Sequence, residues 1–381
     1  MNNLHVSLTE FRHESRVIKQ TTSLVQSGLV DNVYIAALHA DGLPKEQEYF
    51  PSVICKRFKL KTRSLSKNLI FQGIKYLEFC WQIYRSYKKN NIKIVNIHNV
   101  GLLPLGVLLK KLYRAKLVYD THELETETHS LKGRRKKLAK LLEKTLIRYV
   151  DLTLVVSENI ADWYASEYQT ERPPVIMNTP VTKVMASSNI FREHFNIKND
   201  QIIFLYQGGL IRGRGVELIL EAFKSRKDDQ AVVVFMGFGQ LEESIREASI
   251  NYSNIFFMPA VSPDQVLNYT ASADVGFSLA EKTCLSHFYC MPNKLFEYLM
   301  AGLVVVVSNM KEMSEFVSRN QCGFVLESAD IESLNAIIDN VIKTDLVVIK
   351  QKSYQTALSY CWENQEKKML VAYQDMLNTV N

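Results

Sequence analysis

The sequence predicts two α/β domains, each built on a doubly wound parallel sheet. Short apolar runs of strand length alternate with stretches of helical periodicity along most of the chain. These runs lack polar alternation, which is typical of strands buried on both faces of a parallel sheet. The alternation is interrupted at 178–188, where Pro180 and small polar residues indicate a linker.

The first alternation occupies residues 1–178. Strands are expected at 4–8, 33–38, 53–58, 92–97, 116–119, 152–156 and 174–177, and helices at 16–27, 68–89, 102–113 and 132–149. Gly28 should end the first of these helices. Ser157 should cap a further helix that follows the strand at 152–156.

The second alternation occupies residues 189–359. Strands are expected at 201–206, 231–236, 255–258, 275–279, 304–307 and 323–326, and helices at 216–224, 240–249, 263–272, 293–301, 311–319, 331–342 and 349–377. The last of these helices extends to the C-terminal part of the chain. A long loop precedes the helix at 293–301, whereas most other connections are short. Because open α/β sheets bind ligands beyond the carboxyl ends of their strands, this loop is a candidate binding segment.

Composition bounds the class of protein. The 381 residues are 47% hydrophobic and 23% charged, as in a globular protein of two domains. A net charge of +6 suits an anionic ligand or an anionic membrane surface and gives no indication of nucleic-acid binding. The N-terminal residues lack the apolar core of a signal peptide, and no apolar run approaches the roughly 18 residues of a membrane span. Scattered cysteines without a C-x-x-C pair favour reduced thiols, so we expect a cytoplasmic protein, soluble or peripheral to a membrane.

A glycine-rich segment follows the strand at 201–206 and reads YQGGLIRGRG. Glycines such as Gly208 and Gly209 let backbone approach a phosphate closely. Arg214, together with Arg212, would neutralise that phosphate through forked hydrogen bonds. The alternative is a flexible turn with solvated arginines.

Two further segments of the second domain suit a nucleotide. Gly237 and Gly239 follow the next strand and either border a nucleotide base or form a plain turn. Pro292 begins the helix at 293–301, whose free N–H groups and partial positive charge suit a pyrophosphate. Glu297, one turn into that helix, would then reach a ribose hydroxyl pair, unless the segment is an ordinary crossover with a surface glutamate.

Two histidines end strands of the first domain. His98 follows the strand at 92–97, and His122 follows the strand at 116–119 within the run DTHE. Polar residues at the carboxyl ends of parallel strands face a ligand or have a structural role. Asp120 and Glu123 flank His122 and would orient it or raise its pKa. Glu125 and Glu127 are expected on a solvated loop.

The segment 132–148 is strongly basic and reads KGRRKKLAKLLEKTLIR. Its basic face could meet anionic lipid headgroups. Its leucines lie on one helical face, which favours packing against the sheet.

Several segments, in this order, resemble a known family. In the second half these are GGLIRGRGVELILEAF, FMGFGQLEESI, SADVGFSL and PNKLFEYLMAGLVVVVSN, and in the first half ESRVIKQTTSLVQSG and YDTHEL. The C-terminal SYCWENQEKKMLVAYQDML resembles the family's last helix. Together they resemble GT-B glycosyltransferases, in particular glycosyltransferase family 4 and its polysaccharide-building members with a PNKLFEY motif.

The resemblance implies a GT-B fold, in which two Rossmann-like domains face each other across a cleft and residues 360–381 cross back to the first domain. It implies retaining sugar transfer from a nucleotide diphosphate donor, UDP- or GDP-linked, with no metal or other cofactor. Arg214 matches the basic residue that grips the diphosphate, Glu297 matches the glutamate that holds the ribose, and His122 matches the histidine that contacts the sugar and phosphate.

The remaining expected site residues divide between donor and acceptor. The donor side comprises Gly208, Gly209, Arg212, Gly237, Gly239, Pro292, Asn293 and Lys294. The acceptor side comprises His13, His98, Asp120 and Glu123. The resemblance implies a glycan or lipid-linked acceptor in bacterial surface polysaccharide synthesis at the inner face of the plasma membrane.

Two positions depart from the family pattern. Gly209 stands where many members carry an arginine, and Tyr289 stands where the first glutamate of the paired motif contacts the sugar. These departures support a catalytically silent GT-B subunit as an alternative. A nucleotide-sugar epimerase is a second alternative. A nicotinamide-dependent dehydrogenase is disfavoured, because no acidic residue follows a proper glycine fingerprint.

Overall fold

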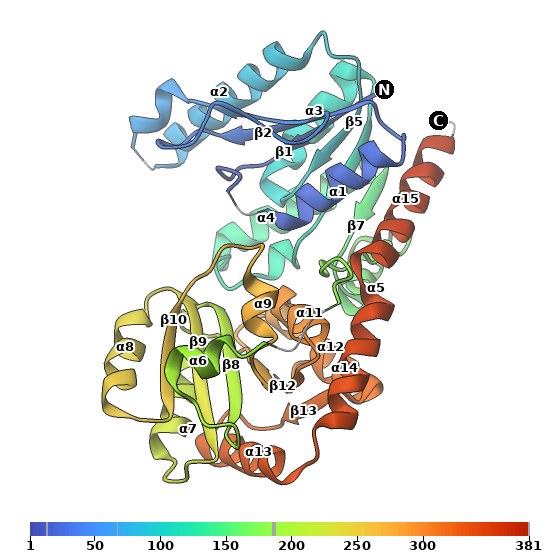
Figure 1. Ribbon diagram of the computed structural model, residues 1–381. Helices are drawn as coiled ribbons and strands as arrows, with labels where there is room; N and C mark the ends of the chain where they lie inside the picture. The colour runs from blue at the N-terminus through green and yellow to red at the C-terminus, as the bar shows by residue number, and fades with distance from the viewer. Residues whose placement is uncertain (13, 67, 185–187, 380–381) are drawn as a thin grey trace. The chain divides into compact units, whose positions relative to one another are not determined.

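The computed structural model describes residues 1–12, 14–66, 68–184 and 188–379. Two compact units form within this part of the chain: residues 1–176 with 366–381, and residues 177–365. Each unit contains one sheet with helices around it (Figure 1). The predicted α/β class, with two Rossmann-like domains, is therefore confirmed.

The sheet of the first unit has seven strands among the residues described. In spatial order they are β3 (Glu46–Phe50), β4 (Val53–Phe58), β2 (Asn32–Leu38), β1 (Asn2–Val6), β5 (Ile92–Ile97), β6 (Lys116–Asp120) and β7 (Leu152–Leu154). All pair in parallel except the edge strand β3, which is antiparallel to β4. The sequence analysis missed β3 because its residues, EQEYF, are partly exposed and form no apolar run.

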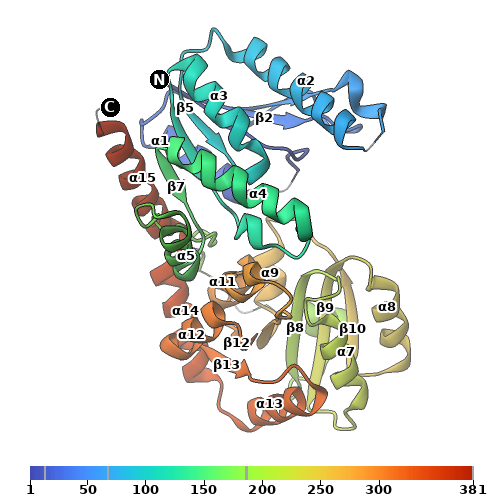
Figure 2. The ribbon, with the colours of Figure 1, turned by 180° about the vertical axis from the view of Figure 1, so that it is seen from behind.

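Helices cover both faces of this sheet. They are α1 (Ser15–Gln26), α2 (Leu69–Tyr87), α3 (Leu103–Tyr113), α4 (Gly133–Leu146) and α5 (Glu158–Tyr168), with short 3-10 turns η1 (Lys61–Ser64), η2 (Val100–Leu102), η3 (Glu125–Glu127) and η4 (Ile147–Tyr149). Helix α1 lies on one face (Figure 1), and α3 and α4 lie on the other (Figure 2). The predicted cap of α5 is confirmed, because Ser157 Oγ accepts a hydrogen bond from the Ile160 N–H.

Two predictions of secondary structure were wrong. Residues 174–177 form no strand, only an isolated bridge between Val155 and Val175. Pro173 and Pro174 have no N–H to donate to a ladder. The helix predicted at 349–377 is two helices, α14 (Val347–Tyr360) and α15 (Trp362–Asn378), because the backbone of Cys361 is extended at ψ 163°.

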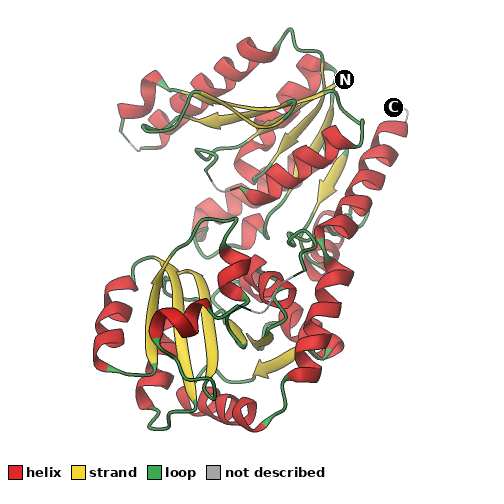
Figure 3. Cartoon of the chain, in the orientation of Figure 1, coloured by secondary structure: helices red, strands yellow, loops and turns green. Residues whose placement is uncertain are grey.

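The sheet of the second unit is parallel throughout (Figure 3). Its order among the described residues is β10 (Ile255–Pro259), β9 (Ala231–Phe238), β8 (Ile202–Gly209), β11 (Val275–Ser278), β12 (Val304–Ser308) and β13 (Gly323–Leu326). The chain builds outward from β8 in one direction and from β11 in the other. The order therefore reverses between β8 and β11, where open sheets of this type bind ligands.

Helices of the second unit bury a large apolar core against this sheet. They are α6 (Ile190–Phe195), α7 (Val216–Ser225), α8 (Glu242–Asn251), α9 (Val266–Thr270), α10 (Leu285–Phe288), α11 (Asn293–Met300), α12 (Lys311–Asn320) and α13 (Ile331–Lys343), followed by α14. The core includes Phe204, Phe223 and Phe277, all fully buried, from β8, α7 and β11. Helix α9 is shorter than the helix predicted at 263–272.

Helix α15 begins in the second unit and ends in the first, as the resemblance implies. There the Asn96 side chain on β5 donates a hydrogen bond to the Tyr373 hydroxyl, and the Lys116 ammonium on β6 contacts the backbone oxygen of Thr379. None of the helices in the described residues combines the length and apolar character that a membrane crossing requires.

Helix α4 packs on the first unit through a buried carboxylate. Glu143 is fully buried and accepts hydrogen bonds from the hydroxyls of Tyr119, Tyr164 and Tyr168 at 2.7, 2.7 and 2.5 Å. Leu138 and Leu141, by contrast, are 67% and 59% exposed. The expectation that the leucines of this segment pack on the sheet is therefore wrong for these two, because Glu143 occupies the inward face.

Replacing Glu143 by leucine should lower the free energy of unfolding by about 3 kcal/mol, because it leaves tyrosine hydroxyls without their acceptor. Urea denaturation followed by circular dichroism measures this. Glu143→Gln, which keeps one acceptor oxygen, should lose less. Equal losses for the two variants would contradict the role of the hydrogen bonds.

Candidate active site

A cavity of about 360 Å³ opens at the carboxyl ends of β8 and β9 in the second unit. Its walls combine the ends of these strands, the segment after β10, α9 and the first turn of α11. The lining residues include Gln207, Gly208, Gly237, Phe238, Pro292, Asn293, Lys294 and Glu297. A loop-and-helix pocket of this size, with a few convergent polar groups, is typical of a small-molecule site.

Glycine is required where the paired strands β8 and β9 reach the cavity. A side chain at Gly237 would place its Cβ 1.9 Å from the backbone oxygen of Gly208. Gly208 itself has φ +112°, a conformation that other residues rarely adopt. The strands therefore extend beyond the predicted strand ends and carry backbone directly to the cavity wall.

Glu297 is held by a chain of side-chain hydrogen bonds. The Gln207 amide nitrogen donates to a carboxylate oxygen of Glu297 at 2.5 Å, and its oxygen accepts from the Thr270 hydroxyl at 2.7 Å. The Glu297 carboxylate is thus oriented in the cavity wall. Sequence analysis missed Gln207 and Thr270. The one available signal was a polar residue inside the apolar run that leads into the two glycines.

The Tyr298 hydroxyl fixes α11 to the sheet. It accepts from the N–H of Gln207 on β8 at 2.9 Å and donates to the backbone oxygen of Phe277 on β11 at 3.2 Å. Its ring packs against Gly276, where a Cβ would lie 2.3 Å from the ring. This contact places the first turn of α11 beside the cavity.

Lys294 lines the cavity, whereas Arg214 is not among the lining residues. The Lys294 ammonium lies 3.8 Å from the centre of the Tyr206 ring. Burial, together with the positive charge of Arg214, lowers the pKa of Lys294 to about 7, against an opposing effect of Glu297. Lys294 is therefore close to half protonated at neutral pH. A bound anion would favour its charged form.

The other predicted donor residues lie around this cavity in different roles. Arg212 is 80% exposed and forms a surface ion pair with Glu217 at 3.4 Å. Gly209 ends β8, and its oxygen accepts from the Tyr206 hydroxyl at 2.9 Å. Gly239 has a packing role, since a Cβ there would lie 2.4 Å from the backbone oxygen of Leu210. Of the predicted donor-side residues, Gly208, Gly237, Pro292, Asn293 and Lys294 line the cavity, as does Glu297.

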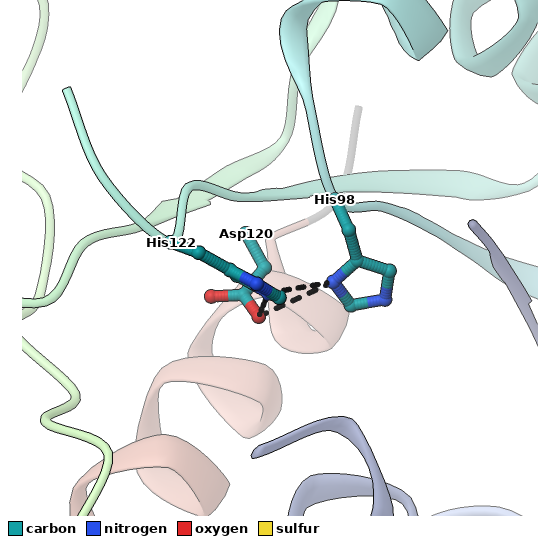
Figure 4. Close-up of side chains that lie close together, drawn as sticks. All are labelled: His98, Asp120 and His122. Carbon is teal, nitrogen blue, oxygen red and sulfur yellow. Dashed lines mark hydrogen bonds and ion pairs between the residues drawn. The ribbon is translucent and has the colours of Figure 1, made fainter. Parts of the chain in front are cut away.

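A second polar cluster lies at the carboxyl ends of strands in the first unit, where Figure 4 shows His98, Asp120 and His122 together. His98 Nδ1 lies 3.1 Å from His122 Nε2, and His122 Nε2 lies 3.2 Å from a carboxylate oxygen of Asp120. His98 and Asp120 are buried, whereas the His122 side chain is 35% exposed. The structure thus brings three predicted residues into one cluster with one of them facing out.

Arg16 on α1 pairs with this cluster and was missed by the sequence analysis. Its guanidinium contacts the Asp120 carboxylate at 2.6 Å and donates to the backbone oxygen of Ile176. Burial opposes ionisation of Asp120, but the charges of Arg16 and His122 overcome it and hold the pKa of Asp120 well below 3.8. The signal was an arginine on the buried face of a predicted helix.

A hydrogen-bonded chain extends from the cluster into β1. The Asn3 amide nitrogen lies 3.1 Å from His5 Nε2, and His5 Nδ1 lies 3.0 Å from His98 Nε2. Burial lowers the pKa of both His5 and His98. With the Asn3 amide donating, His5 carries its proton on Nδ1, and His98 carries its proton on the nitrogen that faces Asp120.

His98, Asp120 and His122 are also the one group in the described residues with metal-ligand character, since their ligand atoms lie within 4.8 Å of one another. The Arg16 guanidinium on the same carboxylate disfavours a second cation there. The metal-independent expectation stays a prediction.

The remaining acceptor-side residues are placed as follows. His13 lies outside the described residues. Glu123 is exposed. The expected solvated loop is wrong for Glu127, which is buried and paired with lysines of α4. Burial, with the charge of Glu123, raises the pKa of Glu125 to about 8.

Two family models match the chain. "Glycosyl transferases group 1" matches residues 187–357, and "Glycosyltransferase Family 4" matches residues 16–181. Together they account for most of both units.

Solved structures share the fold. A sucrose-phosphate synthase from Thermosynechococcus elongatus has a TM-score of 0.82 at 14% identity, over 100% of both chains. HepE from Anabaena, solved with UDP and glucose, has a TM-score of 0.73 at 12% identity over 98% of this chain and 100% of that one. WaaG, a glycosyltransferase involved in lipopolysaccharide biosynthesis, has a TM-score of 0.68 at 16% identity over 99% and 100%.

A curated relative is the lipopolysaccharide 1,2-N-acetylglucosaminetransferase of Salmonella typhimurium, 25% identical over 190 residues. The match spans 45% of this chain and 48% of that protein, about half the length of each.

The fold and the family models define a glycosyltransferase with two Rossmann-like domains. The chain belongs to the GT-B glycosyltransferases and resembles family 4 among them.

Replacing Asp120 by asparagine should lower the free energy of unfolding at pH 7 by about 3 kcal/mol or more, because it leaves Arg16 buried without its counterion. A carboxyl group whose pKa is lower in the folded than in the unfolded protein stabilises the fold at pH values above its unfolded-state pKa. The difference between wild type and variant should therefore be full above pH 3.8 and shrink as the pH falls further.

Denaturation at a series of pH values measures this difference. Asp162→Asn is the matched control, because its ion pair with Arg172 is exposed and should contribute little. A pH-independent difference for Asp120→Asn would contradict the ion-pair account.

Proposed function

We propose that the protein is a retaining glycosyltransferase that moves a sugar from a nucleoside diphosphate donor, UDP- or GDP-linked, to a saccharide or lipid-linked glycan. The observation that carries the proposal is the cavity of the second unit, where Glu297, Lys294 and the first turn of α11 line one space and the charge of Arg214 acts on Lys294. Its size and its polar groups suit a nucleotide.

In this proposal the Glu297 carboxylate accepts hydrogen bonds from the ribose hydroxyls. Its hydrogen bond from Gln207 fixes the carboxylate before the ligand arrives. Phe238, which is 68% exposed at the cavity wall, offers an apolar surface to the base.

The diphosphate would lie toward the two cations and the start of α11. The acceptor oxygen bonds to the anomeric carbon while the bond from that carbon to the β-phosphate oxygen breaks. The leaving phosphate oxygen takes the acceptor's proton on the same face, which gives retention without a carboxylate nucleophile. Arg214 and protonated Lys294 stabilise the negative charge that grows on the leaving group, and preorganised charge of this kind is usually the largest catalytic term.

The first unit supplies the acceptor side of the proposal. Its proposed functional residue is His122, which Asp120 orients and which His98 links to the hydrogen-bonded chain from β1. A cavity of about 390 Å³ at the ends of β1 and β2 is lined by apolar side chains with Arg63 and Lys75. It suits an acceptor with an apolar part.

The relatives support the proposed cellular role. The curated relative's name and that of WaaG both refer to lipopolysaccharide, which supports surface polysaccharide synthesis at the inner face of the plasma membrane. The basic segment 132–148 supports contact with anionic lipid, since Arg134, Arg135 and Lys137 are exposed.

Thermal unfolding with UDP, GDP, ADP and their sugars tests the donor site. A nucleotide at 100 times its dissociation constant should add about 2.7 kcal/mol of stability. Arg214→Ala should abolish this gain, whereas Arg212→Ala should keep it, because Arg212 is paired with Glu217 on the surface.

Failure of every nucleotide at millimolar concentration to stabilise wild type would overturn the donor site and favour a silent subunit. Conversion of the donor alone, without an acceptor, would instead indicate an epimerase. The anomeric configuration of the product, measured by NMR, tests retention.

Nucleotide binding should weaken as the pH rises above 7, because Lys294 has a pKa of about 7 in the free protein and the diphosphate binds its protonated form. Calorimetry at pH 8 in two buffers of different ionisation enthalpy should show uptake of close to one proton. Lys294→Met should bind more weakly with no such uptake. Uptake by the variant equal to that of wild type would contradict the assignment.

A further inference from the structure

Besides the apolar side chains that it buries, such as Phe79 and Ile83, helix α2 carries an apolar stripe that is exposed. Ile70, Leu77 and Trp81 recur at helical spacing and are 75%, 67% and 57% exposed. Exposing a stripe of this kind to water is unfavourable, and contiguous apolar patches mark interaction sites. Within the described residues, no other element covers this stripe.

The two neighbouring helices continue this surface (Figure 2). The Tyr113 hydroxyl of α3 donates to the backbone oxygen of Tyr84 on α2, and their rings stack 6.0 Å apart. On α3, Leu108 and Leu112 are each 48% exposed. Lys111 of α3 lies over the ring of Tyr149 in η4, which directly follows α4. Three helices thus form one surface, which also includes the exposed leucines of α4 described above.

Charge on this surface has one sign. Its exposed cations include Arg85, Lys111, Arg134, Arg135, Lys144 and Arg148. The two acidic residues of these helices are engaged within the first unit: Glu143 is buried, and the half-buried Glu78 accepts hydrogen bonds from the backbone N–H groups of Lys61 and Thr62. The surface therefore offers apolar side chains and positive charge without exposed carboxylates in these described helices.

A second copy of the chain fits this surface poorly. A two-fold symmetric interface sets the same patch against itself, so the cations would face one another. Leucine and isoleucine side chains give nucleic acid little to recognise. An anionic bilayer takes both components, because aliphatic side chains enter the acyl boundary, tryptophan and tyrosine sit at the interface, and cations meet the headgroups.

We propose that α2, α3 and α4 with η4 form a surface that inserts into an anionic lipid bilayer, with Trp81 and Leu77 at its centre. Contact of the basic segment 132–148 with anionic lipid would be electrostatic. The proposal adds the insertion of apolar side chains from two further helices. It does not depend on the donor cavity, which lies in the other unit.

Flotation with phosphatidylcholine vesicles containing phosphatidylglycerol tests the surface. Wild type should bind, and less so in pure phosphatidylcholine or at high salt. Leu77→Ser/Trp81→Ser should weaken binding about tenfold or more, and Arg134→Glu/Arg135→Glu should do the same.

Matched controls make the same kinds of substitution at exposed residues away from the proposed surface. Val347→Ser/Val348→Ser removes two apolar side chains that are 58% and 55% exposed in the second unit. Lys367→Glu/Lys368→Glu reverses two adjacent exposed cations of α15. Both should bind vesicles as wild type does. All variants should keep the wild-type circular dichroism and midpoint of thermal unfolding, which shows that they fold.

Tryptophan fluorescence reports insertion directly. Trp81 is the most exposed of the three tryptophans, since Trp362 is buried and Trp163 is half-buried. Anionic vesicles should shift the emission to the blue, and brominated lipid should quench it. Trp81→Phe should lose both changes.

Three outcomes would overturn the proposal: wild type that does not bind anionic vesicles, serine variants that bind as tightly as wild type, or a wild-type dimer that Leu77→Ser/Trp81→Ser converts to monomer. The last result would assign the surface to a second copy. Because nucleotide stabilisation is measured separately, failure of vesicle binding leaves the donor site standing, and failure of the donor site leaves this surface standing.

Discussion

The cavity of the second unit depends on one hydroxyl. Tyr298 binds the backbone of β8 and β11 at the point where these neighbouring strands separate. Its ring fits only because residue 276 is glycine. Glu297 precedes Tyr298 in the helix, and Lys294 lies one turn earlier, so the same contact sets the position of both side chains at the cavity. A helix held by packing alone would leave the polar groups of the strand ends unsatisfied.

In the first unit, imidazole side chains supply the hydrogen bonds at the strand ends. Its strand order reverses between β1 and β5, and His5 of β1 meets His98 just beyond β5 at that point. The buried charge of Asp120 is matched by Arg16, which keeps the carboxylate ionised beneath His122. In both units, hydrogen-bonded side chains at the reversal of strand order orient one polar residue, Glu297 in the second unit and His122 in the first. This arrangement is a physical reason for binding at the reversal of strand order.

Much of the fold could be predicted because buried parallel strands are continuous apolar runs. The runs at 231–236, 275–279 and 304–307 correspond to β9, β11 and β12. Prediction failed where apolar content was low, as in β3, or where a local backbone break stopped a periodic segment, as at Cys361. The exposure of the apolar stripe on α2 could not be predicted from the sequence. Helical periodicity shows that a helix has an apolar face, but it does not show what that face contacts.

The candidate site, like the fold, could be predicted from the sequence only in part. The sequence alone determined which residue types stand at strand ends and helix starts, since motifs such as YQGG, DTHE and PNKLFEY are local and their chemistry is readable without coordinates. Only the tertiary structure decided which of them share a space. Arg212 and Arg214 are two residues apart, yet one pairs with Glu217 on the surface while the charge of the other acts on Lys294 at the cavity. Arg16 and Asp120 are 104 residues apart and form one ion pair. Burial and long-range contact set partner, pKa and orientation, and both arise when distant segments pack against each other.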